Sequence, residues 1–370
     1  MQKKLIALAV AAVTSGAAFA QSNVTIYGNV DMGMMFRQGS NGAVASGQSQ
    51  YDLQSAASQS HIGFKGVEDL GNGLKALFDL QYRISPDTNT GLATAGRQYV
   101  GLTGGFGTAV AGYLDGIRFG IYGKYNPFGN YSVASMTSMT TQYDRAANAV
   151  AYISPSFSGF TVILATATNT QGAEGTLNSV HSPAKPSGGN TGDDRLLSAN
   201  LIYANGPLSI DLDYETTRAV GYDRDRLYVA TAGASYDFGV VKVSGLYDVI
   251  KGDANSFIGG NTTFAAAAFG LAANQRYDRR NWFLGATVPV GKAKFLAMFG
   301  QVKDKTLSDA DAWKVGVGAR YALSKRTELY ADYAHIKNDT NGKYTINPMG
   351  NGAGTSVGIN GLAMGIKHSF

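Results

Sequence analysis

Residues 361–370 read Gly-Leu-Ala-Met-Gly-Ile-Lys-His-Ser-Phe, and this stretch decides the fold. Taken in steps of two, one set of side chains is mostly apolar and the other is small or charged; the first set is Leu362, Met364, Ile366, His368 and Phe370. Consecutive side chains of a β-strand point to opposite faces, so the stretch predicts a strand with one oily face and one wet face. Residues 24–36 repeat this alternation, and we expect the two strands to pair and close a barrel.

The first twenty residues have the features of a secretory leader. Lys3 and Lys4 precede a short apolar run, and residues 18–20 (Ala-Phe-Ala) form a small-residue cleavage site. We expect a signal peptide over residues 1–20 and one mature domain over residues 21–370. No segment reaches about 18 consecutive apolar residues, which disfavours a helical membrane protein.

The composition narrows the class of protein further. The chain contains no cysteine, which excludes a disulfide-stapled secreted module. Its formal net charge is only +5, and two of the positive charges are Lys3 and Lys4 of the leader. So small a positive charge does not indicate a nucleic-acid partner. The 48 glycines and 21 tyrosines fit many strands, with glycine where backbones crowd and aromatic rings where a surface meets a membrane boundary.

The clearest alternation lies at residues 74–83. Leu74, Phe78 and Leu80 fall on one face, and Asp79 and Arg83 fall on the other. The same kind of pattern, bounded by turn residues, predicts about sixteen strands. Their expected ranges are 24–36, 61–67, 74–83, 97–103, 107–113, 148–154, 159–168, 196–205, 208–217, 226–237, 240–251, 276–289, 292–303, 311–322, 327–337 and 361–370.

Short turns and long loops alternate between these strands, as in an antiparallel outer-membrane β-barrel. Residues 38–57, 169–194, 252–275 and 338–354 are expected to be loops. A barrel of about 16 strands leaves an aqueous channel that its own side chains do not fill. The irregular stretch 114–146, which is rich in aromatic residues, is the candidate for a loop that folds inward and narrows the channel.

Several motifs, singly weak, occur together and in a fixed order. They are Val24-Thr25-Ile26-Tyr27-Gly28, Gly66-Val67-Glu68-Asp69-Leu70-Gly71-Asn72-Gly73-Leu74-Lys75-Ala76, Gly96-Arg97-Gln98-Tyr99-Val100-Gly101-Leu102, Phe106-Gly107-Thr108, Asn126-Pro127-Phe128-Gly129, Ser154-Pro155-Ser156-Phe157-Ser158-Gly159-Phe160 and the terminal Phe370. In these motifs the whole mature chain resembles the general diffusion porins of Gram-negative beta-proteobacteria, of the neisserial and burkholderial type.

The resemblance implies a sixteen-stranded homotrimer in outer-membrane lipid, with the third external loop narrowing each pore. It also implies that Phe370 is read by the barrel assembly machinery. Arg97 and Arg145 match two arginines of the family's pore wall. Where two others are usual, this chain has His61 within Ser-His-Ile-Gly and Tyr113 within Gly-Tyr-Leu, so strong anion selectivity is not predicted.

We expect Lys75, Arg83, Arg97 and Arg145 to face Asp115, or other groups of the loop, across the narrowest point of the pore. Such a constriction would orient permeating solutes in a transverse field, because charged side chains set channel selectivity electrostatically. His61 falls on the lumen face by its strand phase, and we place it and Tyr113 among the constriction residues. The alternative is that most of these charges simply line a wet wall.

The remaining motifs favour structural interpretations. Residues 354–358 fit the pattern G-x-S-x-G around Ser356, but a strand follows where a nucleophile elbow needs a helix. Residues 237–239 (Asp-Phe-Gly) read as a hairpin turn, and the four histidines lack the spacing of zinc ligands, so no metal or cofactor is predicted.

The predicted function is a passive, water-filled pore for ions and small hydrophilic solutes. A substrate-selective channel or adhesin that uses the loops at 169–194 and 252–275 remains as one alternative. A barrel hydrolase that uses Ser356 remains as the other.

Overall fold

The computed structural model describes residues 23–44, 49–88, 92, 94–140, 145–168, 195–218, 227–253, 276–346 and 358–370. These residues form one antiparallel sheet: β1 (Asn23–Gln38), β2 (Gln50–Gln54), β3 (His61–Gly71), β4 (Leu74–Arg83), β5 (Thr94–Gly104), β6 (Gly107–Asp115), β7 (Arg145–Ile153), β8 (Phe160–Thr168), β9 (Arg195–Asn205), β10 (Leu208–Arg218), β11 (Leu227–Asp237), β12 (Lys242–Asp253), β13 (Arg276–Val290), β14 (Ala293–Asp304), β15 (Ala312–Ala322), β16 (Thr327–Asn338) and β17 (Asn360–Ser369).

The sheet closes on itself, because β1 pairs with β17 along one edge and with β3 along the other. The predicted closing pair is therefore confirmed. Phe370 completes the seam: its backbone N–H donates to the carbonyl of Gly28 at 3.0 Å, and its own carbonyl accepts from the N–H of Gly28 at 3.2 Å. Closure satisfies the edge groups that hydrocarbon would otherwise leave unpaired, at several kcal/mol each.

One element was missed in the sequence. Residues 38–57 were expected to be a loop, but they contain β2, which pairs with Gly33–Arg37 of β1. The partner strand β3 covers only Asn23–Asn29 of β1, so the outer half of β1 needs another partner on that side. Without β2, sixteen strands form the barrel, as predicted.

The wall has two faces along its length. In β10, Leu212 and Tyr214 are 49% and 48% exposed, whereas Asp211 and Asp213 are 2% and 4% exposed. The sequence pattern assigned the first pair to the oily face and the second pair to the lumen, and the structure confirms that assignment. The apolar side chains thus cover the outside of the barrel, where they meet lipid.

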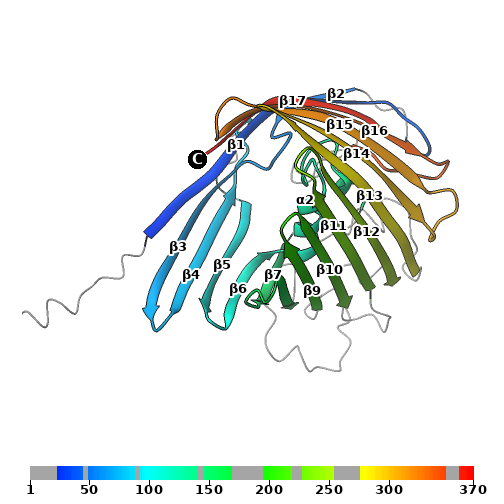
Figure 1. Ribbon diagram of the computed structural model, residues 1–370. Coiled ribbons are helices and arrows are strands. Elements are labelled where there is room, and N and C mark those ends of the chain that lie inside the picture. The colour runs from blue at the N-terminus through cyan, green and yellow to red at the C-terminus, as the bar shows by residue number, and fades with distance from the viewer. Residues whose placement is uncertain are drawn as a thin grey trace, which may run out of the picture.

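A loop lies inside the ring of strands (Figure 1). We call residues 116–140 the inner loop; it contains helix α2 (Ile117–Tyr125) and the 3-10 helix η1 (Met136–Met139). The expected irregular stretch at 114–146 is therefore partly regular, because β6 continues to Asp115 and β7 begins at Arg145. Neither helix described in the structure is long and apolar enough to span a membrane.

Packing, more than intrinsic propensity, holds α2, since two of its nine residues are glycine. Ile121, Tyr122 and Tyr125 are buried against β11 and β12. The helix stops where the N–H of Asn126 bonds to the carbonyl of Tyr122, because a proline follows at position 127.

Glycines of the wall allow the inner loop to lie directly against the strands. A Cβ on Gly316 of β15 would come 2.7 Å from Cβ of Ala134, and one on Gly300 of β14 would come 2.6 Å from Sδ of Met136. These positions explain part of the high glycine content, since only glycine gives the loop enough room.

Several sequence-based expectations lie outside the described residues. They are the signal peptide at 1–20, the loop at 169–194, all but two residues of the loop at 252–275, and the motif serine Ser356.

Candidate functional site

Two arginines and two aspartates meet on the lumen face of β4–β7. Arg97 Nε lies 2.9 Å from Asp79 Oδ2, and its Nη1 lies 3.1 Å from Asp115 Oδ2. Arg145 Nε lies 3.0 Å from the other oxygen of Asp115. Tyr27 of β1 donates its hydroxyl to Asp79 at 2.5 Å. These five residues form what we call the arginine cluster.

The strand register explains how the arginine cluster assembles. Asp115 and Arg145 are direct partners in the β6–β7 pair. Asp115 is the last residue of β6, before the inner loop, and Arg145 is the first residue of β7, after it. The cluster holds two guanidinium groups and two carboxylates, and its formal charges cancel. It is therefore a set of ion pairs in which each guanidinium group contacts a carboxylate, and not a group of unpaired arginines.

His61 and Arg83 flank the arginine cluster. They are direct partners in the β3–β4 pair and point the same way. The His61 ring meets the Tyr27 ring edge-on with 6.0 Å between centroids, and its Nδ1 lies 3.0 Å from the carbonyl oxygen of Gln59. The structure thus brings five predicted site residues together: His61, Arg83, Arg97, Asp115 and Arg145.

Lys75 is not part of this group. It pairs in register with Thr103 beside a short turn, eight residues from Arg83 along β4. At about 3.4 Å per residue, the two positions are about 27 Å apart. Lys75 is exposed near the short-turn end of the barrel, away from the inner loop.

Tyr113 lies on the opposite face of the wall. Its register partner is Gln98, whose own partner in β4 is Leu80, and Leu80 is 38% exposed on the outside. Between Gly112 and Leu114, β6 advances by two residues while β7 advances by three, so the extra residue lies in β7, next to Asn148 with its positive φ of 50°. Tyr113 was placed in the constriction by its position in the family motif, and its role there stays a prediction.

The inner loop is fastened to the wall by a buried ion pair. Arg118 of α2 binds Asp248 of β12, and their side chains are 2% and 0% exposed. Tyr122 donates its hydroxyl to the same carboxylate at 2.7 Å. Burial, reinforced by the Asp248 carboxylate, raises the pKa of Tyr122, so the phenol stays neutral and remains a donor.

Further polar contacts continue this attachment along the wall. Lys124 Nζ lies 2.5 Å from Asp211 of β10, and Ser132 donates to Asp332 of β16 at 2.7 Å. Lys314 of β15 donates to the carbonyl of Ser135 at 2.5 Å. The inner loop is therefore bound from β10 round to β16.

Exposure shows which side of the lumen is left open. The inward groups Asp248 and Lys314 are both fully buried beneath the inner loop. Arg97 and Asp115 on the other wall have side chains 33% and 32% exposed. The open part of the lumen therefore borders Arg97 and Asp115, whereas Arg145, 5% exposed and 6.0 Å from the centre of the Phe119 ring, lies against the inner loop.

Sequence reasoning did not single out Tyr27, Arg118 or Asp248. Tyr27 stands in phase with the polar face of β1, which is a usable signal. Arg118 and Asp248 are 130 residues apart, and no local pattern links them.

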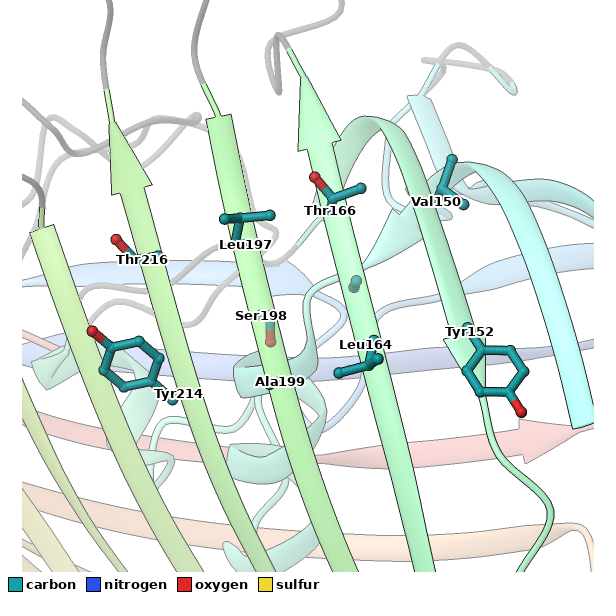
Figure 2. A pocket seen from close by; sticks show the side chains of 10 residues that line it. Val150, Tyr152, Leu164, Thr166, Leu197, Ser198, Ala199, Tyr214 and Thr216 are labelled. Atoms are coloured by element: carbon teal, nitrogen blue, oxygen red, sulfur yellow. The ribbon is translucent and has the colours of Figure 1, made fainter.

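A groove of about 460 Å³ lies on the outside of β7–β10 and is separate from the passage. Figure 2 shows Leu164 and Ala199 between the rings of Tyr152 and Tyr214 on this face. Its lining contains no ionisable group other than these phenols, and it faces outward. The groove therefore belongs to the oily surface of the barrel.

Comparison with known proteins gives consistent matches over the whole length. A sequence profile described as Gram-negative porin matches residues 7–341. Outer membrane porin protein 32 of Delftia acidovorans is 32% identical, and the match covers 100% of both chains. Major outer membrane protein P.IB of Neisseria gonorrhoeae is 29% identical over 88% of this chain and 91% of that protein.

Solved structures agree. An anion-selective porin from Comamonas acidovorans is 28% identical, with a TM-score of 0.71 over 95% of this chain and 100% of that one. The trimer form of OmpT from Vibrio cholerae is 14% identical, with a TM-score of 0.64 over 94% of this chain and 99% of that one. At that identity the second likeness concerns the fold alone.

Proposed function

Because this chain belongs to the Gram-negative porin family, and its barrel is a passive diffusion pore of the outer membrane, we propose that the arginine cluster and the inner loop together select what passes. The observation that carries the proposal is the exposure of Arg97 and Asp115 beside a loop whose own anchors are buried.

The selection works without a conformational cycle. Water fills the lumen of a barrel this wide, and a solute moves down its own gradient. Ions keep most of their hydration shell and exchange part of it for charged side chains at the narrowest level. The inner loop limits the size of solute, and the charges beside it bias the sign.

The expected bias is a weak preference for anions. Asp79 and Asp115 neutralise the formal charge of Arg97 and Arg145. Lys65 adds a positive group nearby: its Nζ lies 5.1 Å from the centre of the Tyr27 ring, and it makes no ion pair within the described residues. The relative from Comamonas acidovorans is described as anion-selective, which supports the direction of this bias.

Assembly is part of the same proposal. We expect a homotrimer, as in the trimeric form described for OmpT of Vibrio cholerae. Phe370 is 41% exposed at the seam and is available as a recognition signal for the barrel assembly machinery. Removal of Phe370 should reduce the amount of folded trimer in outer membranes, measured on unheated gels, and an unchanged amount would argue against the signal.

Recording single channels in planar bilayers tests the function. Pure protein should give stepwise, ohmic openings, and small hydrophilic solutes should not block them. Saturable block by one solute would favour the substrate-selective alternative instead. Lipid hydrolysis that disappears in Ser356→Ala would revive the hydrolase.

A further inference from the structure

The lipid-facing surface of β12–β16 carries a sector of positive charge near the ends of these strands that the long loops join, which we call the external end. Lys251, Arg280, Lys303 and Lys337 point outward, because their neighbours Ile250, Arg279, Val302 and Ile336 are at most 1% exposed. Lys305 follows β14 and is exposed. We call these five cations the basic rim: Lys251, Arg280, Lys303, Lys305 and Lys337.

A row of aromatic rings lies directly beneath the basic rim. Trp282 and Phe299 have centroids 5.7 Å apart, Phe299 and Trp313 are 5.9 Å apart, and Trp313 and His335 are 5.5 Å apart. We call these four residues the aromatic belt; they come from the neighbouring strands β13–β16 (Figure 1). Aromatic girdles of outer-membrane barrels sit at the membrane–water interface, so the basic rim stands at the level of the lipid headgroups.

The basic rim is only partly neutralised. Lys251 and Arg280 lie 3.4 Å and 4.0 Å from Asp278, and Lys303 lies 2.8 Å from Asp311. Within the described residues, Lys305 and Lys337 make no ion pair. The described carboxylates on this side are Asp278, Asp309, Asp311 and Asp339, four against the five cations of the basic rim, so the sector keeps a small positive excess.

The strands on both sides of the barrel seam carry no such charge on their outward face. At the external ends of β1, β3, β4 and β17 the outward positions are held by Phe36, Ile62, Tyr82 and Leu362. These neighbours can meet acyl chains but have no charge to offer a headgroup. The sector over β12–β16 therefore differs from the seam side of the wall.

We propose that the basic rim binds the phosphorylated headgroups of lipids in the outer leaflet, while their acyl chains pack on the aromatic belt. Lysine and arginine form charge-assisted hydrogen bonds to phosphate oxygens. A basic residue near a membrane surface enriches an anionic lipid by roughly fivefold.

The chain carries its own reporters for this contact. It has two tryptophans, and both Trp282 and Trp313 lie in the aromatic belt. Bromine on an acyl chain quenches tryptophan only by close approach. We would reconstitute the full-length protein in phosphatidylcholine vesicles with a small fraction of either brominated phosphatidic acid or brominated phosphatidylcholine, and measure tryptophan fluorescence.

The expected result is at least about twofold stronger quenching by the brominated anionic lipid than by an equal fraction of the brominated neutral lipid, given the enrichment per cation. The double variant Lys305→Gln/Lys337→Gln should lose most of that excess. Lys325→Gln/Arg326→Gln, in an exposed turn at the opposite end of the barrel, is the matched control and should keep it.

Salt provides an arm that needs no variant. Raising the ionic strength to about 1 M shortens the screening length to about 3 Å and should abolish the excess in the wild type. Equal quenching by the two lipids at low salt would overturn the proposal. Protection of both tryptophans from both lipids would also overturn it, because a second chain would then cover the sector.

Discussion

Replacing Arg118 with methionine tests whether the buried ion pair holds the inner loop. Methionine keeps much of the aliphatic volume of the side chain and removes the cation beside Asp248. Because the two side chains are 2% and 0% exposed, water does not replace the lost partner. Breaking one side of such a pair costs about 3–5 kcal/mol, since an unpaired charge stays buried.

A second substitution separates the charge from the packing. Asp248→Asn in the Arg118→Met background removes the stranded charge and still offers an oxygen to the hydroxyl of Tyr122, which lies 2.7 Å from Asp248. We expect this double variant to recover most of the lost stability. Arg326→Met, at an exposed turn, is the matched control and should change the free energy of unfolding by less than about 0.5 kcal/mol.

Two measurements read the result. Unfolding in urea gives the free energy, and single-channel recording gives the noise of the open state, which should rise in Arg118→Met as the inner loop loosens. A loss below about 1 kcal/mol with unchanged noise would place Arg118 among pairs of little consequence. A double variant as unstable as the single one would refute the stranded-charge reasoning.

Three other predictions follow from the passage and its wall. Arg97→Ser should move the reversal potential under a salt gradient toward cations, whereas Lys75→Ser should move it less, because Lys75 lies far from the cluster; equal shifts would contradict this. Gly316→Val should push Ala134 and the inner loop into the lumen, lowering conductance and costing about 1–3 kcal/mol of stability by overpacking, and unchanged conductance would show that the loop does not abut β15. Acidification from about pH 8 to about pH 5 should raise the anion preference of the wild type, since a protonated imidazole adds positive charge, and should raise that of His61→Gln less. An identical response in both proteins would show that His61 does not contribute to selectivity.

The barrel was predictable because its information is local. In β4, the alternation of Phe78 and Leu80 with Asp79 and Gln81 assigns the two faces without any knowledge of the partners. The strand β2 was not predictable in this way. It pairs with the part of β1 that β3 leaves without a partner, and that gap is evident only when the pairing of β3 is known. Tyr113 was placed by its position in the family motif, and its role in the constriction stays a prediction.

The site was predictable in its members more than in its connections. The resemblance to porins supplied Arg97 and Arg145, but it did not say that both would bind Asp115. The contact between Arg118 and Asp248 joins residues 130 positions apart, so it depends on the barrel being closed around the loop. Long-range polar anchors of this kind leave no periodic trace in a sequence.

The central claim is that one wall separates lipid from an enclosed column of water, and spin labels on two adjacent residues test it most directly. Phe64 points outward beside Ile26, which is 58% exposed, and Lys65 is exposed toward the lumen. Collision of each label with oxygen and with a water-soluble nickel chelate would be measured in vesicles. The label at Phe64 should meet mainly oxygen and the label at Lys65 mainly nickel, whereas the same collision pattern at both positions would contradict a two-faced wall.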